Sequence, residues 1–191
     1  MNFAVVTVHP ALVKYAVSLQ AQNSNALGFL PACVFERGAE AGQLFLGLLN
    51  GEPCGYVLAE SGYRGIMRCR QTCIQYDARR RLYGAMLVAA VEKYGEDLGC
   101  WRKVVRCASD LDANEFWRSM GYMLVGIEPC GKSRRRYRSH INIWHKALNP
   151  TKVVTKWKNG RPRVHASNAA RQAAYRQRRS SVTLHVSGQV T

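Results

Sequence analysis

Hydrophobic positions follow two repeats along this chain, and together these repeats predict an ordered series of strands and helices. Alternating or β-branched apolar runs predict strands over residues 3–8, 43–49, 54–59, 66–75, 103–108, 122–127 and 139–147. Apolar residues at helical spacing predict helices over residues 11–20, 32–41 and 82–98, and a short helix that ends at Gly121. Asn50-Gly51 predicts a hairpin between the second and third strands. Asp110 or Asp112 is the expected cap of the short helix. The order β-α-α-β-β-β-α-β-α-β-β predicts an α/β fold whose mixed sheet has a single parallel crossover.

The stretch 71–91 carries the most specific chemistry. It is predicted to be a strand, then a turn containing Arg79, Arg80 and Arg81, then a largely buried helix from Leu82. The first N–H groups of a helix have no partner within it and lie at the positive end of its dipole. With three cationic side chains beside them, these groups predict a binding site for a diphosphate. The alternative is a solvated arginine turn before a core helix.

Charge is distributed unevenly along the chain, and this changes the expected partner. The chain has 191 residues and a net charge of +16. Residues 1–60 contain two basic and four acidic residues, residues 61–150 contain seventeen and eight, and residues 151–191 contain nine and none. Such asymmetry predicts a polyanionic partner, with nucleic acid first and an anionic lipid or a phosphate-rich cofactor next.

Seven cysteines without a C-x-x-C pair predict reduced, mostly buried thiols and no metal site. Cys69 and Cys73 lie four residues apart in a predicted strand and are expected on the same side of it. No apolar run approaches the ~18–20 residues that cross a bilayer, and the N-terminus lacks the features of a signal peptide. We therefore expect an intracellular, cytoplasmic protein without a membrane partner.

Two motifs carry a resemblance to a known enzyme superfamily. The turn R/Q-x-x-G-x-G/A is matched by Arg79-Arg80-Arg81-Leu82-Tyr83-Gly84, with leucine in place of the first glycine. The pattern N-x-x-A-x-x-F-Y-x-x-x-G-F is matched over residues 110–122 at Ala113, Phe116 and Gly121. With the order of elements, these motifs make residues 3–148 resemble the GNAT acetyltransferase superfamily, which implies a GNAT-like fold and N-acetyltransferase activity.

The resemblance implies acetyl-CoA as the cofactor and indicates where it would bind. Backbone groups of Thr72, Cys73 and Ile74 would pair with the pantetheine arm and polarise the thioester carbonyl. Amides of the turn would hold the pyrophosphate, with arginine side chains adding charge. The expected cofactor-binding residues of the turn and the second motif are Arg79, Arg80, Arg81, Leu82, Tyr83, Gly84, Ala85 and Trp117. Because Leu82 lacks the freedom of glycine at positive φ, we expect ordinary backbone angles in the turn, or else a reduced affinity for the cofactor.

The second motif leaves the catalytic acid open. Many family members use its tyrosine, but here Trp117 takes that place, and an indole N–H is not a usable acid. Tyr122, Ser119, Tyr83 or water could protonate the leaving thiolate. The candidate bases are Asp110, Asp112, Glu115 and Gln71. We take Tyr122, Ser119 and Asp110 as the candidate catalytic residues, with catalysis by orientation and carbonyl polarisation alone as the alternative.

Two basic segments are candidate nucleic-acid contacts. Residues 131–138 place five cations around Tyr137, which would stack on a base, although a solvated hairpin is the alternative. The tail 149–191, expected to be separate from an acyltransferase domain 1–148, contains a Gly-Arg-Pro-Arg sequence similar to an AT-hook and a predicted helix over 168–179. A cationic extension without a partner is the alternative for the tail. The expected nucleic-acid contacts are Arg134, Arg135, Arg136, Tyr137, Arg138, Arg161, Arg163, Arg171, Arg176, Arg178 and Arg179.

The leading hypothesis is an acetyl-CoA-dependent N-acetyltransferase whose acceptor amine belongs to nucleic acid or is carried by it, as in a modified base or an aminoacyl-tRNA. One alternative is base modification by non-acetyl chemistry, as in the GNAT-like Mom proteins of phages. Another is a non-catalytic GNAT-fold module that binds nucleic acid. A compact enzyme with a basic arm suits a phage or mobile element, and the protein would then act in the host cytoplasm. DNA or RNA as the partner, and a homodimeric state, are left open.

Overall fold

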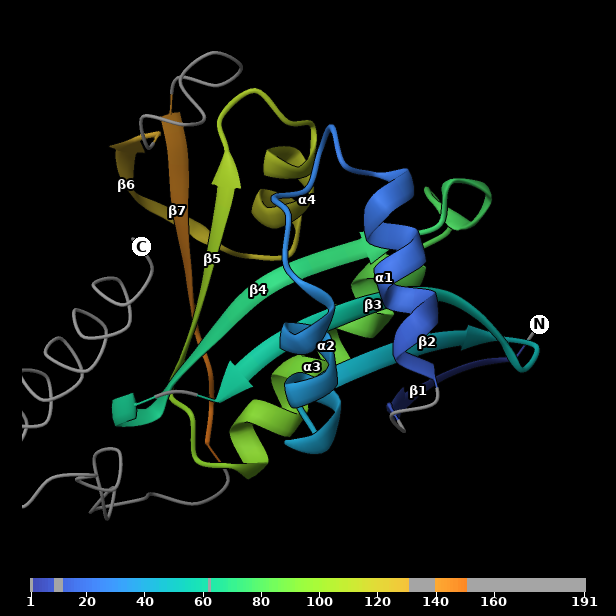
Figure 1. Cartoon of the computed structure of the whole chain (residues 1–191). Coiled ribbons are helices and arrows are strands. Elements are labelled where there is room, and N and C mark those ends of the chain that lie inside the picture. Colours follow the sequence, from blue (N-terminus) through green and yellow to red (C-terminus); the bar gives the residue numbers. More distant parts are fainter. Residues whose placement is uncertain (1, 9–11, 62, 131–139, 151–191) are drawn as a thin grey trace, which may run out of the picture. The chain divides into compact units, whose positions relative to one another are not determined.

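The computed structural model describes residues 2–8, 12–61, 63–130 and 140–150, and within these ranges seven strands form one sheet with four helices packed on its faces (Figure 1). The strands are β1 (Phe3–Thr7), β2 (Leu44–Leu49), β3 (Glu52–Ser61), β4 (Ile66–Ile74), β5 (Arg102–Ala108), β6 (Met123–Pro129) and β7 (His140–Ala147). The helices are α1 (Val13–Gln22), α2 (Ala32–Glu40), α3 (Tyr83–Asp97) and α4 (Ala113–Ser119), with short 3-10 turns η2 (Tyr63–Gly65) and η3 (Tyr76–Ala78). The predicted order of elements and the mixed α/β class are confirmed.

The sheet has the strand order β1-β2-β3-β4-β5-β7-β6. All neighbouring pairs are antiparallel except β4 and β5, which are parallel. Parallel neighbours need a crossover connection, and α3 provides it. The predicted single parallel crossover is therefore confirmed.

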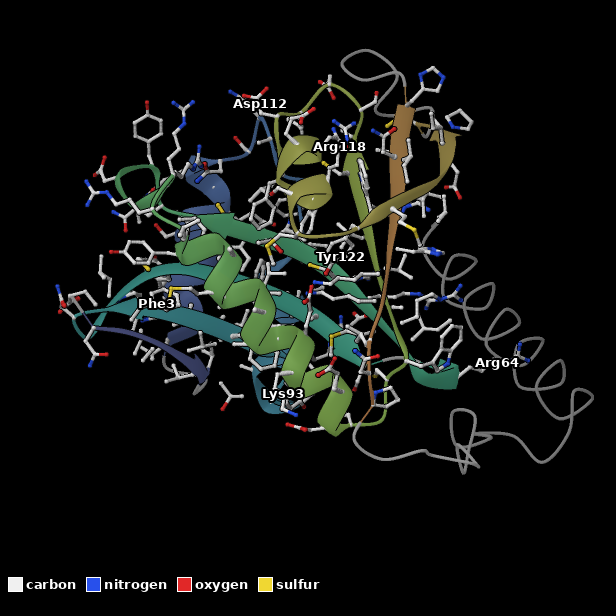
Figure 2. All side chains as sticks on the ribbon, turned by 180° about the vertical axis from the view of Figure 1, so that it is seen from behind. Phe3, Arg64, Lys93, Asp112, Arg118 and Tyr122 are labelled. Carbon is white, nitrogen blue, oxygen red and sulfur yellow. The ribbon has the colours of Figure 1, made fainter. Side chains whose placement is uncertain are left out.

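Two cores hold the helices on opposite faces of the sheet. α1 and α2 lie over β2, β3 and the C-terminal half of β4, where Phe35, Leu44 and Tyr56 are buried. α3 and α4 lie on the other face, seen in front in Figure 2, where Leu87 and Trp144 are buried. No helix of the described ranges is both long and apolar enough to cross a membrane.

A β-bulge in β4 divides the strand between these cores. Leu58 pairs with Gln71 but Ala59 pairs with Cys69, so Arg70 is the extra residue. Cys69 consequently belongs to the core under α3, whereas Cys73 belongs to the core under α1 and α2. The expectation that both cysteines face one side is wrong because it assumed an unbroken period of two. All seven cysteines are free, and all but the exposed Cys33 are buried, as predicted.

The predicted turn residues take the expected backbone conformations. Asn50 and Gly51 join β2 to β3 with φ values of 52° and 90°, as a two-residue hairpin requires. Gly121 follows α4 with φ 79°. Asp112 lies at the N-cap position of α4, as predicted, but its side chain forms no capping hydrogen bond. The buried amide of Asn114 instead donates hydrogen bonds of 2.7 Å to the carbonyl oxygens of Ala108 and Leu111, which ties the start of α4 to the end of β5.

Candidate active site

The two parallel strands separate at the centre of the sheet and leave an open wedge. β4 and β5 pair only from Ile66 with Arg102 to Cys69 with Val105. Beyond that point β4 stays paired with β3, while β5 stays paired with β7 (Figure 1). The backbone groups of β4 that face away from β3 therefore have no ladder partner on β5 after Cys69. Unpaired main-chain donors and acceptors of this kind are the groups that an extended ligand can use.

The turn before α3 forms one end of the wedge and uses two residues in the left-handed region. Arg80 has φ 59° and Leu82 has φ 63°. The expectation of ordinary backbone angles is wrong, because Leu82 takes the conformation that a glycine would adopt without strain. Its side chain is 76% exposed and thus does not fill the site. No side chain caps the start of α3, so the first amides of the helix are available to an anion.

Gly84 lets the first turn of α3 approach two other elements closely. A Cβ atom at this position would lie 3.4 Å from Cγ1 of Ile74 in β4 and 3.6 Å from Cε2 of Phe116 in α4. The end of β4, the start of α3 and α4 therefore converge on one glycine. This position is the second glycine of the predicted turn motif, and both distances are ordinary van der Waals contacts for a methyl group.

Of the three arginines in the turn, Arg79 is already engaged by the protein. Its Nε donates a hydrogen bond of 2.9 Å to the carbonyl oxygen of Ile74, and its Nη2 lies 2.5 Å from Oδ1 of Asn23 at the end of α1. Arg79 thus fastens the end of β4 to the α1–α2 connection. Arg80 and Arg81 are exposed and have no hydrogen-bond or ion-pair partner among the described residues. They are the two arginines free to meet a diphosphate.

The predicted residues of β4 lie along the wedge, with their side chains directed to alternate faces. The Thr72 hydroxyl lies 3.1 Å from Sγ of Cys69 on the α3 face. Burial raises the pKa of the Cys73 thiol to about 11, although Arg79 opposes this shift. Cys73 is accordingly a protonated core thiol at neutral pH and not a nucleophile. What these residues offer a ligand is their backbone.

Among the candidate acids of the second motif, Tyr122 is committed to the core. Its buried hydroxyl donates a hydrogen bond of 2.7 Å to Oε1 of Glu92 in α3. Burial and the neighbouring Glu92 carboxylate raise its pKa well above the usual value. Trp117 is buried too and packs edge-on against Phe116 and Tyr122. The geometry therefore argues against Tyr122 as the acid that protonates a leaving thiolate.

The other candidates are distributed over the ends of α4 and α3. The exposed Ser119 hydroxyl donates to the carbonyl oxygen of Phe116 in its own helix. Asp110 is exposed and precedes α4. Tyr83 stacks on Phe3 of β1, with ring centroids 5.1 Å apart. The Gln71 side chain is buried, accepts from the Tyr56 hydroxyl and donates to Gln20 of α1 and to the carbonyl oxygen of Gly28, so it is not a base. The Tyr122 and Ser119 hydroxyls are thus each bonded to another group, Glu92 and the Phe116 carbonyl oxygen.

A buried ionic cluster beneath α3 was not foreseen from the sequence. Glu92 accepts from Lys146 at 2.7 Å and lies 3.9 Å from Nζ of Lys103. Lys103 is fully buried, and no hydrogen-bond partner of its Nζ is present among the described residues. The polar residue within the apolar pattern of 103–108 was the only sequence signal for this cluster. No group of three or more His, Cys, Asp or Glu side chains suited to a metal occurs in the described part of the chain.

Two surface hollows lie along α1 and α2. One has a volume of about 440 Å³, and the other, near the exposed Phe29, has a volume of about 300 Å³. Neither lies in the wedge between β4 and β5. The predicted contacts in 131–138 and 151–191 lie outside the described residues.

These features agree with the comparison to known proteins. Residues 15–122 match the acetyltransferase (GNAT) family, and this match spans more than half of the chain. The chain belongs to the GNAT acetyltransferase family. No curated protein matches its sequence significantly.

Solved GNAT structures share the fold at low sequence identity. Ard1 from Thermoplasma volcanium superposes with a TM-score of 0.68 at 11% identity, covering 78% of this chain and 99% of that one. The ribosomal-protein-S18-alanine N-acetyltransferase from Escherichia coli gives 0.64 at 12% identity, covering 82% and 100%. An aminoglycoside 6'-N-acetyltransferase complexed with coenzyme A gives 0.63 at 16% identity, covering 80% and 99%.

This GNAT protein is an acetyl-CoA-dependent N-acetyltransferase, and its own residues fit that cofactor. Acetyl-CoA supplies an acetyl group activated as a thioester. The amides that begin α3, with Arg80 and Arg81, suit its diphosphate. The unpaired backbone edge of β4 at 72–74 suits the extended pantetheine arm and can orient the thioester carbonyl.

Proposed function

We propose that this GNAT enzyme acetylates an amine that belongs to nucleic acid or is carried by it. The observation that carries the proposal is the charge distribution: twenty-six of the 28 lysines and arginines follow residue 60, and the last 41 residues contain no acid. A cationic excess of this size favours a polyanionic partner and steers it to the protein electrostatically. A modified base and an aminoacyl-tRNA are examples of acceptors in which an amine is carried by a polyanion.

The enzyme would accelerate acetyl transfer chiefly by orienting the donor and the acceptor amine. The β4 edge and the start of α3 hold the donor, and an amine that arrives neutral is then presented to a polarised carbonyl. Orientation of this kind can contribute about 7–11 kcal/mol to lowering a barrier. With Trp117 in place of the usual tyrosine and the Tyr122 hydroxyl bonded to Glu92, water is the simplest proton donor to the departing thiolate. Ser119 and Asp110 are the remaining protein candidates.

The deciding experiment offers isotopically labelled acetyl-CoA and several acceptors to the full chain. Total RNA, charged tRNA, genomic DNA, basic peptides and an aminoglycoside are incubated separately and analysed by mass spectrometry. The peptides and the aminoglycoside are included because structural neighbours are named for such acceptors. Label in RNA, aminoacyl-tRNA or DNA supports the proposal. Label confined to peptides or the aminoglycoside contradicts it, and an unlabelled base modification would favour the Mom-like alternative.

A further inference from the structure

In the C-terminal half of the sheet, the side that carries α1 and α2 has a face that none of the described helices covers. Register fixes which side chains share it: Arg68 pairs with Val104, Val104 with His145, and Arg106 with Ile143. α1 and α2 lie over β2, β3 and the end of β4, and no helix of the described residues covers β5, β7 and β6 on this side (Figure 1).

Four arginines gather on this face, and we call them the arginine strip: Arg68 and Arg70 from β4, and Arg102 and Arg106 from β5. Two acids lie at its edges. Glu60 pairs with Arg70 at 3.3 Å, and Glu128 pairs with Arg106 at 2.6 Å. Arg68 and Arg102 have no acidic partner in the part of the chain that the structure describes.

The charges of Arg68 and Arg102 are therefore not compensated by an acid of the described residues. The nearby His145 does not add to them, because burial and Arg102 lower its pKa and leave the ring neutral at pH 7. Between the arginines the floor is formed by half-buried Val104 and Ile143. Cations placed around a partly apolar floor suit a ligand with regularly spaced anions and flat, weakly polar groups.

An aromatic side chain stands at the outer end of the strip. Trp101 is 48% exposed, and its Nε1 donates a hydrogen bond of 3.0 Å to the carbonyl oxygen of Arg64, which holds the indole in place. The Arg102 guanidinium lies 4.6 Å from the ring centroid. An anchored, exposed indole next to arginines is the arrangement on which unpaired bases stack in proteins that bind single strands.

The other end of the strip reaches the wedge. Arg70 and Arg106 directly follow Cys69 and Val105, the last pair that β4 and β5 form before they separate. An extended ligand that lies along the strip would therefore run from Trp101 toward the wedge, where the acetyl group would be held.

We propose that the arginine strip, with Trp101 at its outer end, binds a single-stranded segment of nucleic acid and leads it to the wedge. The arginines contact successive phosphates, and Trp101 stacks on one base. Charge complementarity selects a polyanion, and the anchored indole favours nucleic acid over an acidic protein. The inference rests on the proposed function, because the bound strand is the one that carries the acceptor amine.

The test compares two neutralising double variants of the full chain that remove the same charge. Arg68→Gln/Arg102→Gln alters the strip, and Lys14→Gln/Arg37→Gln alters exposed cations on α1 and α2. Binding of fluorescent single-stranded DNA, the matching RNA and a duplex is followed by anisotropy across a salt series. Coenzyme A binding and the melting temperature of each variant show that the fold is intact.

We expect the strip variant to lose about tenfold or more in single-strand affinity, and its slope of log K against log salt to fall by roughly 1.4, as for two lost phosphate contacts. Trp101→Ala should weaken single-strand binding about tenfold and duplex binding less. The α1–α2 control should bind within about twofold of wild type, because neither of its residues is part of the strip.

The outcomes separate this inference from the proposed function. If strip and control variants bind alike while the wild type acetylates nucleic acid, the strip is not the contact surface and only this inference falls. If the strip variant alone loses binding but label enters only peptides, the surface is supported and the proposed function fails. If the wild type binds polyglutamate through the strip and none of the oligonucleotides, the occupant is an acidic protein and the inference is overturned.

Discussion

The Tyr122 hydroxyl donates a 2.7 Å hydrogen bond to Oε1 of Glu92, a carboxylate that also accepts from Lys146. This relationship turns a candidate catalytic tyrosine into a structural one. The hydroxyl is buried, its proton is committed to a carboxylate, and its pKa is raised by burial and by that charge. A group with those properties holds α3 to the sheet and the start of β6.

Tyr122→Phe should therefore impair stability more than catalysis. Loss of a hydrogen bond to a charged group is expected to lower the free energy of unfolding by about 1.5–3 kcal/mol. The rate constant kcat should stay within about threefold of wild type, which steady-state kinetics would show. Ser119→Ala, tested beside it, should also retain activity, because that hydroxyl bonds within its own helix. A large loss of kcat for Tyr122→Phe, with loss of the alkaline limb of its pH profile, would restore Tyr122 as the acid.

The strained turn before α3 predicts that a glycine is accepted there. Leu82 has φ 63°, a conformation that costs a residue with a side chain about 1–2 kcal/mol. Glycine avoids this strain, but its greater freedom in the unfolded chain offsets part of the gain in stability. Leu82→Gly should thus raise the free energy of unfolding by about 0.5–1 kcal/mol. Leu98→Gly is the matched control, because Leu98 is an exposed leucine at a helix end with φ −80°. It should be destabilised by about 0.5–1 kcal/mol in the same urea titrations. Equal effects of both changes would show that Leu82 is not strained.

Gly55 of β3 should be required for the shape of the wedge. A Cβ atom there would meet the side chain of Ile74 and lie 2.7 Å from the carbonyl oxygen of Cys73, so the end of β4 would have to move. Gly55→Ala is expected to weaken coenzyme A binding at least about tenfold and to cost about 1–3 kcal/mol of stability. Isothermal titration calorimetry and thermal unfolding measure the two effects.

Gly126→Ala in β6 is the control for this change, since its new methyl group would meet only Ile143 Cδ1 at 3.8 Å. Its coenzyme A affinity should equal that of the wild type. Unaltered affinity in Gly55→Ala would mean that the cofactor does not use this part of β4.

The buried Lys103 predicts a dependence of stability on pH. Burial lowers its pKa in the folded protein below the usual 10.5, against the attraction of nearby anionic groups. Between the lowered pKa and 10.5 the unfolded chain binds more protons than the folded protein does. The contribution of Lys103 to the free energy of unfolding therefore rises with pH through that range. Below the lowered pKa the destabilising effect is complete.

Lys103→Met removes this titration. We expect it to be more stable than the wild type by about 1–3 kcal/mol at pH 7, because Glu92 keeps Lys146 and Tyr122 as partners. The gain should shrink as the pH approaches 10.5, which urea titrations at several pH values would show. Lys93→Met, at an exposed position of α3, should produce no such trend. A destabilised Lys103→Met at neutral pH would indicate that Glu92 depends on Lys103.

Local pattern accounts for much of the fold and for the position of the cofactor turn. The period of the apolar residues predicted each strand and helix, and Asn50-Gly51 predicted its hairpin, because these signals act over a few neighbouring residues. The arginine turn does precede a helix, α3, and the diphosphate site at its start stays a prediction. Non-local contacts escaped this reasoning. The bulge at Arg70 reversed the expected side of Cys73, and the partner of Tyr122 lies thirty residues away in the chain.

By itself the sequence determined the order of the elements, the excess of positive charge and the family, since each depends on residue types and their spacing. The tertiary structure decided which of these residues are free to act. It engaged Arg79 with Ile74 and Asn23 and left Arg80 and Arg81 exposed. It also brought Arg68 and Arg102 from separate strands onto one face of the sheet. The physical reason is that burial and pairing arise between elements distant in the chain, where the energy of a side chain depends on neighbours that its own segment does not contain.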